Sequence, residues 1–169
     1  MKNKKTVRII LSVLCLICLG ISLFQIGKIY LENKKSADLN KNLIAEAVVV
    51  NQKNSQSNTT DSGVSQTAKT VMPISVDFRV LQEKNPDIIA WVYCPDTVIH
   101  YPIVKSQDNA DYLYRLPNGK YNASGTLFTD FRNTPDFSDW NTIVYGHNMK
   151  NGTMFGSLSK YKTQAYYDT

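Results

Sequence analysis

This sequence has few cysteines and lacks the usual metal-binding and phosphate-binding motifs, and each absence excludes a class of function. Of the three cysteines, Cys15 and Cys18 lie in an uncharged apolar run and only Cys94 lies outside it, so the rest of the chain has no internal disulfide. A thioredoxin-like redox site needs its C-x-x-C in a soluble strand–helix setting, which excludes that role here. No His/Cys/Asp/Glu cluster has metal-ligand spacing and no glycine-rich phosphate loop is present. We therefore expect neither a metal nor a cofactor.

Positive charge is also missing from most of the chain. The net charge is +5, but residues 1–35 carry seven Lys and Arg against one Glu, which leaves residues 36–169 at −1. Nucleic-acid binding requires a basic patch on the folded region, so we expect no nucleic-acid partner. The basic residues near the N-terminus are better suited to anionic lipid headgroups.

What the sequence does contain, near its start, is a long apolar segment. Residues 9–27 carry no charge, and as a helix they would extend roughly 28 Å, close to the thickness of a bilayer core. The run is longer than the apolar core of a cleavable signal peptide, and Ala45-Glu46-Ala47 lies too far downstream to be its cleavage site. We predict an uncleaved signal anchor at residues 9–29, in a single-pass protein of the cell membrane.

The orientation of this anchor follows from its flanks. Four basic residues precede the segment and four follow it within fifteen residues, so the positive-inside rule is nearly balanced. An eight-residue tail makes a poor exported domain, and its basic residues are more tightly clustered. We therefore predict a cytoplasmic tail at residues 1–8 and an extracellular location for the folded region.

Between the anchor and the folded region, residues 30–72 are interpreted as a juxtamembrane segment and a flexible linker. Leu39, Leu43 and Ala47 recur every four residues, which is typical of a helix. Residues 51–70 are rich in Asn, Gln, Ser and Thr and have a single valine, so they cannot form a core.

The folded region, residues 73–169, reads as mainly β with short helices. Apolar runs bounded by turn residues predict strands over 88–93, 98–104, 125–130 and 142–145, and short helices over 77–84, 109–116 and 153–161. Four short strands are too few to close a barrel, and an open sheet leaves an unpaired edge. Because residues 166–169 still look like core sequence, we expect the chain to be the N-terminal part of a longer domain with an incomplete β-barrel.

The strongest candidate functional residue is His147, which follows the apolar residues 143–145 and Gly146. The glycine is expected to let the backbone turn and a substrate come close. Histidine exchanges protons near neutral pH, so His147 is a candidate acid/base. His100 alternates within residues 98–101 and is expected to be a surface residue of its strand.

The surroundings of His147 resemble a known family. Tyr145-Gly146-His147-Asn148-Met149, followed by Met154-Phe155-Gly156-Ser157-Leu158, resembles the histidine segment of class B sortases. Further ordered blocks that resemble this family are Ile89–Val92, Pro95–Thr97, Tyr101–Val104 and Gly125–Asn133. The resemblance runs from about Ile74 to the last residue.

The resemblance implies a membrane-anchored cysteine transpeptidase of Gram-positive bacteria with a sortase-type β-barrel. Such an enzyme cleaves a sorting signal at Thr and joins the protein to cell-wall peptidoglycan through a thioacyl-enzyme intermediate. The implied partners are surface proteins that carry a sorting signal, of Asn-Pro-x-Thr or related type, and an amine of the peptidoglycan precursor. The sequence does not reveal the individual substrates.

By the same resemblance, His147 is the catalytic histidine, and Tyr145, Asn109 and Leu113 contact the substrate. Packing or helix capping are the alternative roles of the last three. The family's cysteine and arginine follow the histidine, and neither is matched here. Cys94 is interpreted as a small structural residue. Arg115 and Arg132 do not match either, and for Arg132 we expect a pairing with an aspartate.

We therefore expect the 169-residue chain to be inactive by itself. A truncated, non-catalytic membrane-anchored module of sortase type is the alternative function. A third possibility, another kind of histidine-dependent hydrolase, would need acidic or metal partners near His147 that the sequence does not offer. A Cys followed by an Arg downstream of Thr169 would distinguish the first two.

Overall fold

The computed structural model describes residues 2–50 and 73–168, which form two compact units, one up to residue 38 and one from residue 39 onward. The first unit is the greater part of helix α1 (Lys2–Ala47), and residues 39–47 of that helix belong to the second unit. The predicted linker at 51–70 lies outside the described residues.

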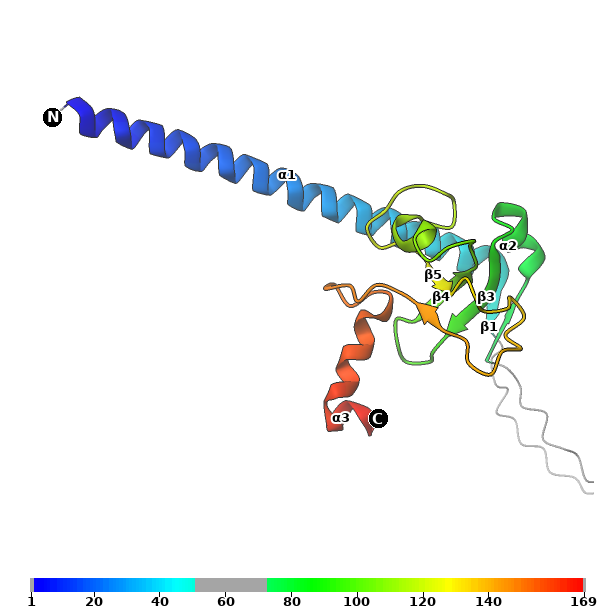
Figure 1. Ribbon diagram of the computed structural model, residues 1–169. Helices are drawn as coiled ribbons and strands as arrows, with labels where there is room; N and C mark the ends of the chain where they lie inside the picture. Colours follow the sequence, from blue (N-terminus) through cyan, green and yellow to red (C-terminus); the bar gives the residue numbers. More distant parts are fainter. Residues whose placement is uncertain (1, 51–72, 169) are drawn as a thin grey trace, which may run out of the picture. The chain divides into compact units, whose positions relative to one another are not determined.

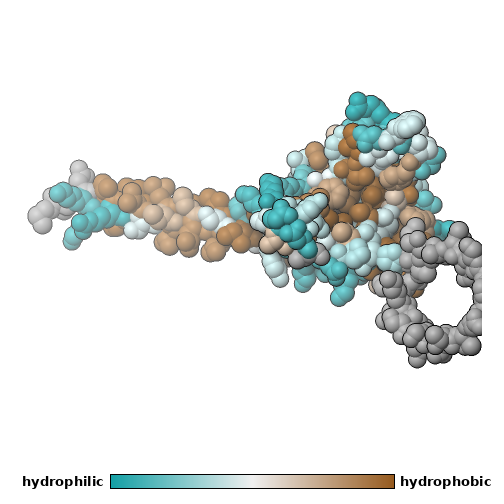
Figure 2. Space-filling model, turned by 90° about the horizontal axis from the view of Figure 1, so that it is seen from below, coloured by the Kyte–Doolittle hydropathy of each residue, from teal (hydrophilic) through white to brown (hydrophobic). Residues whose placement is uncertain are grey.

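The first unit has an apolar surface on all sides of the helix. Leu16 and Phe24 are 67% and 71% exposed, and Figure 2 shows mainly hydrophobic residues along the middle of this segment and hydrophilic ones at its N-terminal end. A helix satisfies its own backbone hydrogen bonds, so exposed apolar side chains all round it suit a lipid environment. By length and composition α1 can cross a membrane, and it contains the predicted anchor at 9–29.

The second unit contains two sheets and several short helices (Figure 1). Its strands are β1 (Val48–Val50), β2 (Ile74–Val76), β3 (Ile88–Tyr93), β4 (His100–Val104), β5 (Leu127–Thr129) and β6 (Val144–Tyr145). Its helices are α2 (Phe78–Lys84), the 3-10 helices η1 (Asp111–Tyr114) and η2 (Phe155–Lys162), and α3 (Gln164–Tyr167). The larger sheet has the order β3-β4-β5-β6, with β4 and β5 parallel and the other pairs antiparallel.

The predicted mixture of short strands and short helices is confirmed, with tighter boundaries. Helix α2 begins after Asp77, whose side chain accepts a hydrogen bond from the backbone N–H of Arg79 at 3.0 Å, as an N-cap does. The helix predicted over 109–116 is reduced to η1, which follows a turn closed by Asp108. Among the described residues the four-stranded sheet does not close into a barrel.

The second unit begins upstream of Pro73, where the sequence placed the start of the folded region. Leu43 and Ala47 are 2% and 3% exposed and belong to the same core cluster as Leu81 and Ile88. The four-residue spacing that predicted a helix also puts these side chains on one face. Strand β1 continues from α1 and pairs with β2, so both sides of the undescribed segment are held in this unit.

His100 is half-buried, and the expectation that it lies on the surface was wrong. Its ring packs against Trp91 and Tyr93, with centroids 5.5 and 4.8 Å away. Its Nε2 is buried without a hydrogen-bond partner, and burial lowers the pKa of the imidazole. The side chain of Asn40 on α1 donates to the His100 backbone carbonyl at 3.0 Å, so this end of β4 is covered by the helix.

Removing the Leu43 side chain should therefore destabilise the second unit. We expect Leu43→Ala to lower the free energy of unfolding by about 2–5 kcal/mol, because the substitution leaves a cavity in the core. Leu158→Ala is the control, since Leu158 is 44% exposed and its truncation should cost less than about 1 kcal/mol. Urea unfolding followed by tryptophan fluorescence would measure both values. Equal effects of the two substitutions would contradict the packing of α1 in this core.

Candidate functional site

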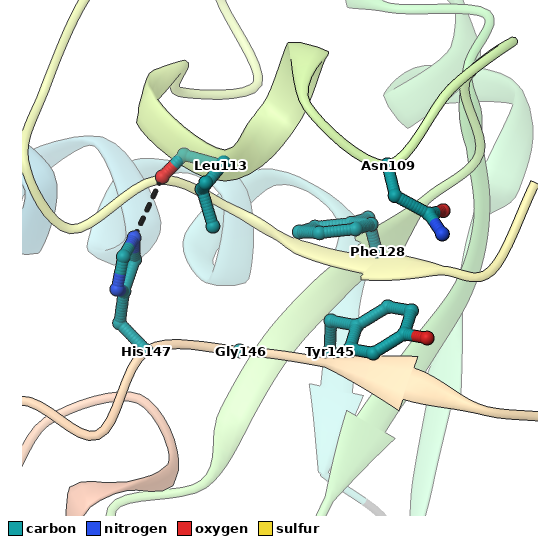
Figure 3. Close-up of a pocket in the computed structure, with 6 residues that line it drawn as sticks. All are labelled: Asn109, Leu113, Phe128, Tyr145, Gly146 and His147. Carbon is teal, nitrogen blue, oxygen red and sulfur yellow. Dashed lines mark hydrogen bonds between the residues drawn. The ribbon is translucent and has the colours of Figure 1, made fainter.

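The residues predicted from sequence to act together lie around one pocket. The pocket has a volume of about 350 Å³ and is lined by Asn109, Leu113, Phe128, Tyr145, Gly146 and His147 (Figure 3). Four of these six are the predicted site residues, and they come from segments more than thirty residues apart, as the 34-residue separation of Leu113 and His147 shows. The structure therefore brings the four together, and their individual roles stay predictions.

The pairing of β5 with β6 forms one wall of the pocket. Phe128 lies opposite Tyr145 in the antiparallel register, and the two ring centroids are 5.3 Å apart. His147 follows two residues after the end of the pairing. Phe128 was not predicted as a site residue, because an apolar residue within a buried strand gives no sign of which cavity it faces.

The opposite wall is formed by η1 and the residues around it. The backbone N–H of Thr126 donates to Tyr112 O at 3.1 Å, and the Thr126 hydroxyl donates to Arg115 O at 2.7 Å. Gly125 has a φ of +57°. A Cβ there would lie 2.4 Å from Leu113 O, so only glycine lets the chain pass this close to η1.

Gly146 is required for packing, and the expectation that it lets the backbone turn was wrong. Its φ is not positive. A Cβ at this position would lie 2.2 Å from Leu127 Cδ2 and 2.7 Å from Phe155 Cδ2. Leu127 and Phe155 therefore fill the space that a Cβ would occupy, and only glycine allows this close packing at the residue before His147.

The imidazole of His147 is held by one hydrogen bond to the main chain. Its Nε2 lies 2.7 Å from Leu113 O (Figure 3), and its ring centroid lies 5.5 Å from that of Tyr114. A carbonyl oxygen can only accept, so Nε2 is the nitrogen that carries the proton in this bond. Nδ1 is therefore the nitrogen that gains or loses a proton when His147 acts as an acid or base.

Two side chains that line the pocket donate to a buried carboxylate that sequence analysis did not assign to the site. Asp130 is 1% exposed, and its side chain accepts hydrogen bonds from Asn109 Nδ2 at 3.0 Å and from the Tyr145 hydroxyl at 2.9 Å. Arg132 pairs with the same carboxylate at 2.9 Å, so the expected pairing of Arg132 with an aspartate is confirmed. The hydrogen bonds from Arg132 hold the pKa of Asp130 well below its usual range, which keeps it ionised.

The other candidate residues do not line the pocket. Cys94 is half-buried in the turn between β3 and β4, where its backbone N–H donates to Ile99 O at 2.9 Å. Arg115 pairs with Asp111 at 2.9 Å. None of Cys94, Arg115 and Arg132 lines the pocket. Within residues 2–50 and 73–168, no group of three or more His, Cys, Asp or Glu side chains could hold a metal ion.

The curated proteins that this chain matches include two sortase B enzymes. The chain is 37% identical to sortase B of Listeria monocytogenes over 151 residues, which are 88% of the chain and 56% of that protein. It is 35% identical to sortase B of Staphylococcus aureus over 91 residues, 54% of the chain and 37% of that protein. The chain thus spans about half the length, or less, of the curated relatives that it matches. No protein-family model matches it.

Solved structures give the same result. Sortase B of Bacillus anthracis, in complex with AAEK1, superposes with a TM-score of 0.62 at 33% identity, over 83% of the chain and 58% of that structure. The S. aureus sortase B–substrate complex gives a TM-score of 0.51 at 35% identity, over 54% and 42%. A class B sortase of Streptococcus pyogenes involved in pilus biogenesis gives 0.52 at 34% identity, over 55% and 51%.

Proposed function

The chain belongs to the class B sortases over the part that it spans, and we propose on this basis that the whole protein is a membrane-anchored cysteine transpeptidase. In this proposal it cleaves the sorting signal of a surface protein at Thr and forms a thioacyl-enzyme intermediate. An amine of the peptidoglycan precursor then resolves the intermediate, which joins the surface protein to the cell wall.

The observation that carries the proposal is that His147, Tyr145, Asn109 and Leu113 all line the same pocket. Motif resemblance assigned these four residues to catalysis and substrate contact without knowledge of their positions in space. A relative of the chain, S. aureus sortase B, has been solved as a substrate complex. These findings support the pocket as the place where the signal peptide binds beside a proton-transferring histidine.

His147 supplies the proton transfers of this reaction. When the thiolate attacks the carbonyl of Thr, the leaving amine must gain a proton, and when the acceptor amine attacks, it must lose one. Nδ1 carries out both transfers, while the bond from Nε2 to Leu113 O keeps the ring in place. The nucleophilic cysteine and the arginine that stabilises the oxyanion have no counterpart at matching positions in these 169 residues. In this proposal both residues lie in the region of the whole protein that corresponds to the part of its relatives not spanned by these 169 residues.

The apolar helix α1 supports the membrane anchoring in this proposal. It contains a long stretch of exposed apolar side chains, preceded by a short basic tail. With the tail in the cytoplasm, the second unit faces the cell wall, where both the sorting signal and the peptidoglycan precursor are available.

The orientation can be tested with protoplasts. We expect protease added to intact protoplasts to remove an epitope placed after Thr70, because that position lies on the outer side. An epitope placed before Lys2 is the matched control and should survive until the membrane is opened with detergent. Protection of the epitope after Thr70 in intact protoplasts would reverse the assignment.

A polypeptide of only these 169 residues should not cleave a sorting-signal peptide. The reason is that Cys94, the only cysteine outside the apolar helix, lies in the β3–β4 turn and does not line the pocket. Release of a fluorophore from a quenched peptide would measure this, with the full-length protein as the positive control. Cleavage that disappears in Cys94→Ala would show that Cys94 is the nucleophile after all.

In the full-length protein, His147→Ala and His147→Gln should both lower kcat/KM by roughly 10²–10⁴-fold, because neither side chain transfers a proton. His147→Ala also removes the bond to Leu113 O, which should cost about 0.5–1.5 kcal/mol of stability, whereas the Gln amide can still donate. Peptide kinetics and thermal melts on both variants would test this. Turnover retained by His147→Gln would mean that the histidine only supports the structure.

A further inference from the structure

The buried carboxylate of Asp130 accepts five hydrogen bonds, two of them from side chains that line the pocket. Its Oδ1 accepts from the backbone N–H and the Nε of Arg132, at 3.0 and 2.9 Å. Its Oδ2 accepts from Arg132 Nη2 at 3.1 Å, in addition to Tyr145 and Asn109. A carboxylate has about four acceptor positions, and five donors occupy them here. Asp130 therefore has no acceptor position left for a ligand, and its hydrogen bonds hold other groups of the protein in place.

Two of these donors belong to side chains that line the pocket. The Asn109 amide is fixed at both ends, because its Nδ2 donates to Asp130 and its Oδ1 accepts from the backbone N–H of Phe131 at 2.9 Å. This pattern also settles which end of the amide is nitrogen. The Tyr145 hydroxyl donates its only proton to Asp130, so toward a ligand it can only accept. Figure 3 shows the Tyr145 hydroxyl and the Asn109 amide pointing to the same side.

The charge of Asp130 is stabilised from outside the pocket. The guanidinium of Arg132 pairs with the carboxylate, while the Arg132 side chain itself is 70% exposed. A buried carboxylate without such a partner would be strongly unfavourable. Lys105 Nζ donates to the carbonyl oxygens of Asp130 and Phe131, at 3.3 and 3.0 Å, so the backbone at this position is also held.

We propose that Asp130 is the positioning residue of this site: its carboxylate, paired with Arg132, holds Tyr145 and Asn109 in the orientation in which they meet the substrate. The inference rests on the proposed function, because it assigns the two side chains to substrate binding. Two tasks then belong to different residues. His147 moves protons, and Asp130, through Tyr145 and Asn109, determines how tightly the peptide is bound.

The same unit contains a matched hydrogen bond between two side chains that do not line the pocket. The Tyr112 hydroxyl donates to Asp87 Oδ2 at 2.6 Å and accepts from Asn85 Nδ2 at 2.8 Å. Neither Tyr112 nor Asp87 lines the pocket. Asp87→Asn therefore replaces the charged acceptor in the same kind of tyrosine–carboxylate bond and reports the effect of general loss of stability.

The test uses peptide kinetics and a tyrosine titration on the full-length protein in detergent. With a peptide containing Asn-Pro-Ala-Thr as the probe, Asp130→Asn should raise KM about ten-fold or more, as expected for lost bonds to a charged group, and change kcat by less than about three-fold. Asp87→Asn should leave KM within about two-fold. A double-substitution cycle of Asp130→Asn with Tyr145→Phe should show non-additive effects on KM, because the first weakens and the second removes the same bond.

The titration reads the Asp130–Tyr145 bond without any substrate. The hydrogen bond to Asp130 is the main reason that the pKa of Tyr145 is raised above its ordinary value. Asp130→Asn should lower this pKa, measured from the 13C signal of the tyrosine Cζ and assigned with Tyr145→Phe. Asp87→Asn should leave it unchanged.

The outcomes separate this inference from the proposed function. An unchanged Tyr145 titration in Asp130→Asn, or equal increases of KM in Asp130→Asn and Asp87→Asn, would overturn the positioning role. A titration that shifts as expected, in a full-length protein that does not cleave the peptide, would support the Asp130–Tyr145 bond and overturn the proposed function.

Discussion

The short strand β5 is the constraint on which the rest of the second unit depends. Its three residues, Leu127, Phe128 and Thr129, are 0%, 3% and 0% exposed, and they pair in parallel with β4 and antiparallel with β6. A strand this short has few hydrogen bonds of its own, so burial on both faces must supply most of its stability. The register with β6 places Tyr145 opposite Phe128, and the residue after β5 is the buried Asp130. The positions of Tyr145 and of Asp130 therefore both depend on the position of one strand.

This arrangement explains why the site can be built from segments that lie far apart in the sequence. A buried charge must be paired, and Asp130 finds its donors on three segments: the residues before η1, the turn after β5, and β6. Each of these segments also has apolar contacts or backbone bonds that fix it independently, such as the close approach of Gly125 to Leu113 and of Gly146 to Leu127. Packing thus brings the polar groups within reach, and the hydrogen bonds then select one orientation for each side chain. A site assembled on strands and short turns in this way can hold its groups more accurately than one on long loops.

The sequence predicted most of the elements and the members of the pocket, and its failures have a common physical origin. Alternation and turn residues located strands β3 to β6 but not β1 and β2. The family resemblance, at the motif around His147 and at Asn109 and Leu113, located four of the six pocket residues. The failures concern partners that are distant in the chain. The spacing of Leu39, Leu43 and Ala47 indicates a helix but does not show that its apolar face enters the core of the second unit. Alternation within β4 cannot show that Trp91 and Tyr93 pack against His100. Gly146 was assigned conformational freedom, whereas two side chains from elsewhere, Leu127 and Phe155, are what require it.

In the proposed function, His147 must be both held in place and reactive. If both nitrogens of His147 were bonded to acceptors of the protein, the ring would be stabilised as imidazolium and would give up its proton reluctantly. If neither were bonded, the ring would rotate freely and lose its alignment with the substrate. The single bond from Nε2 to Leu113 O avoids both, because a neutral carbonyl orients the ring without adding a full negative charge beside it. The buried carboxylate of Asp130 instead accepts hydrogen bonds from Tyr145 and Asn109 and is paired with Arg132. In the proposed function, the charge of Asp130 therefore orients Tyr145 and Asn109 rather than His147.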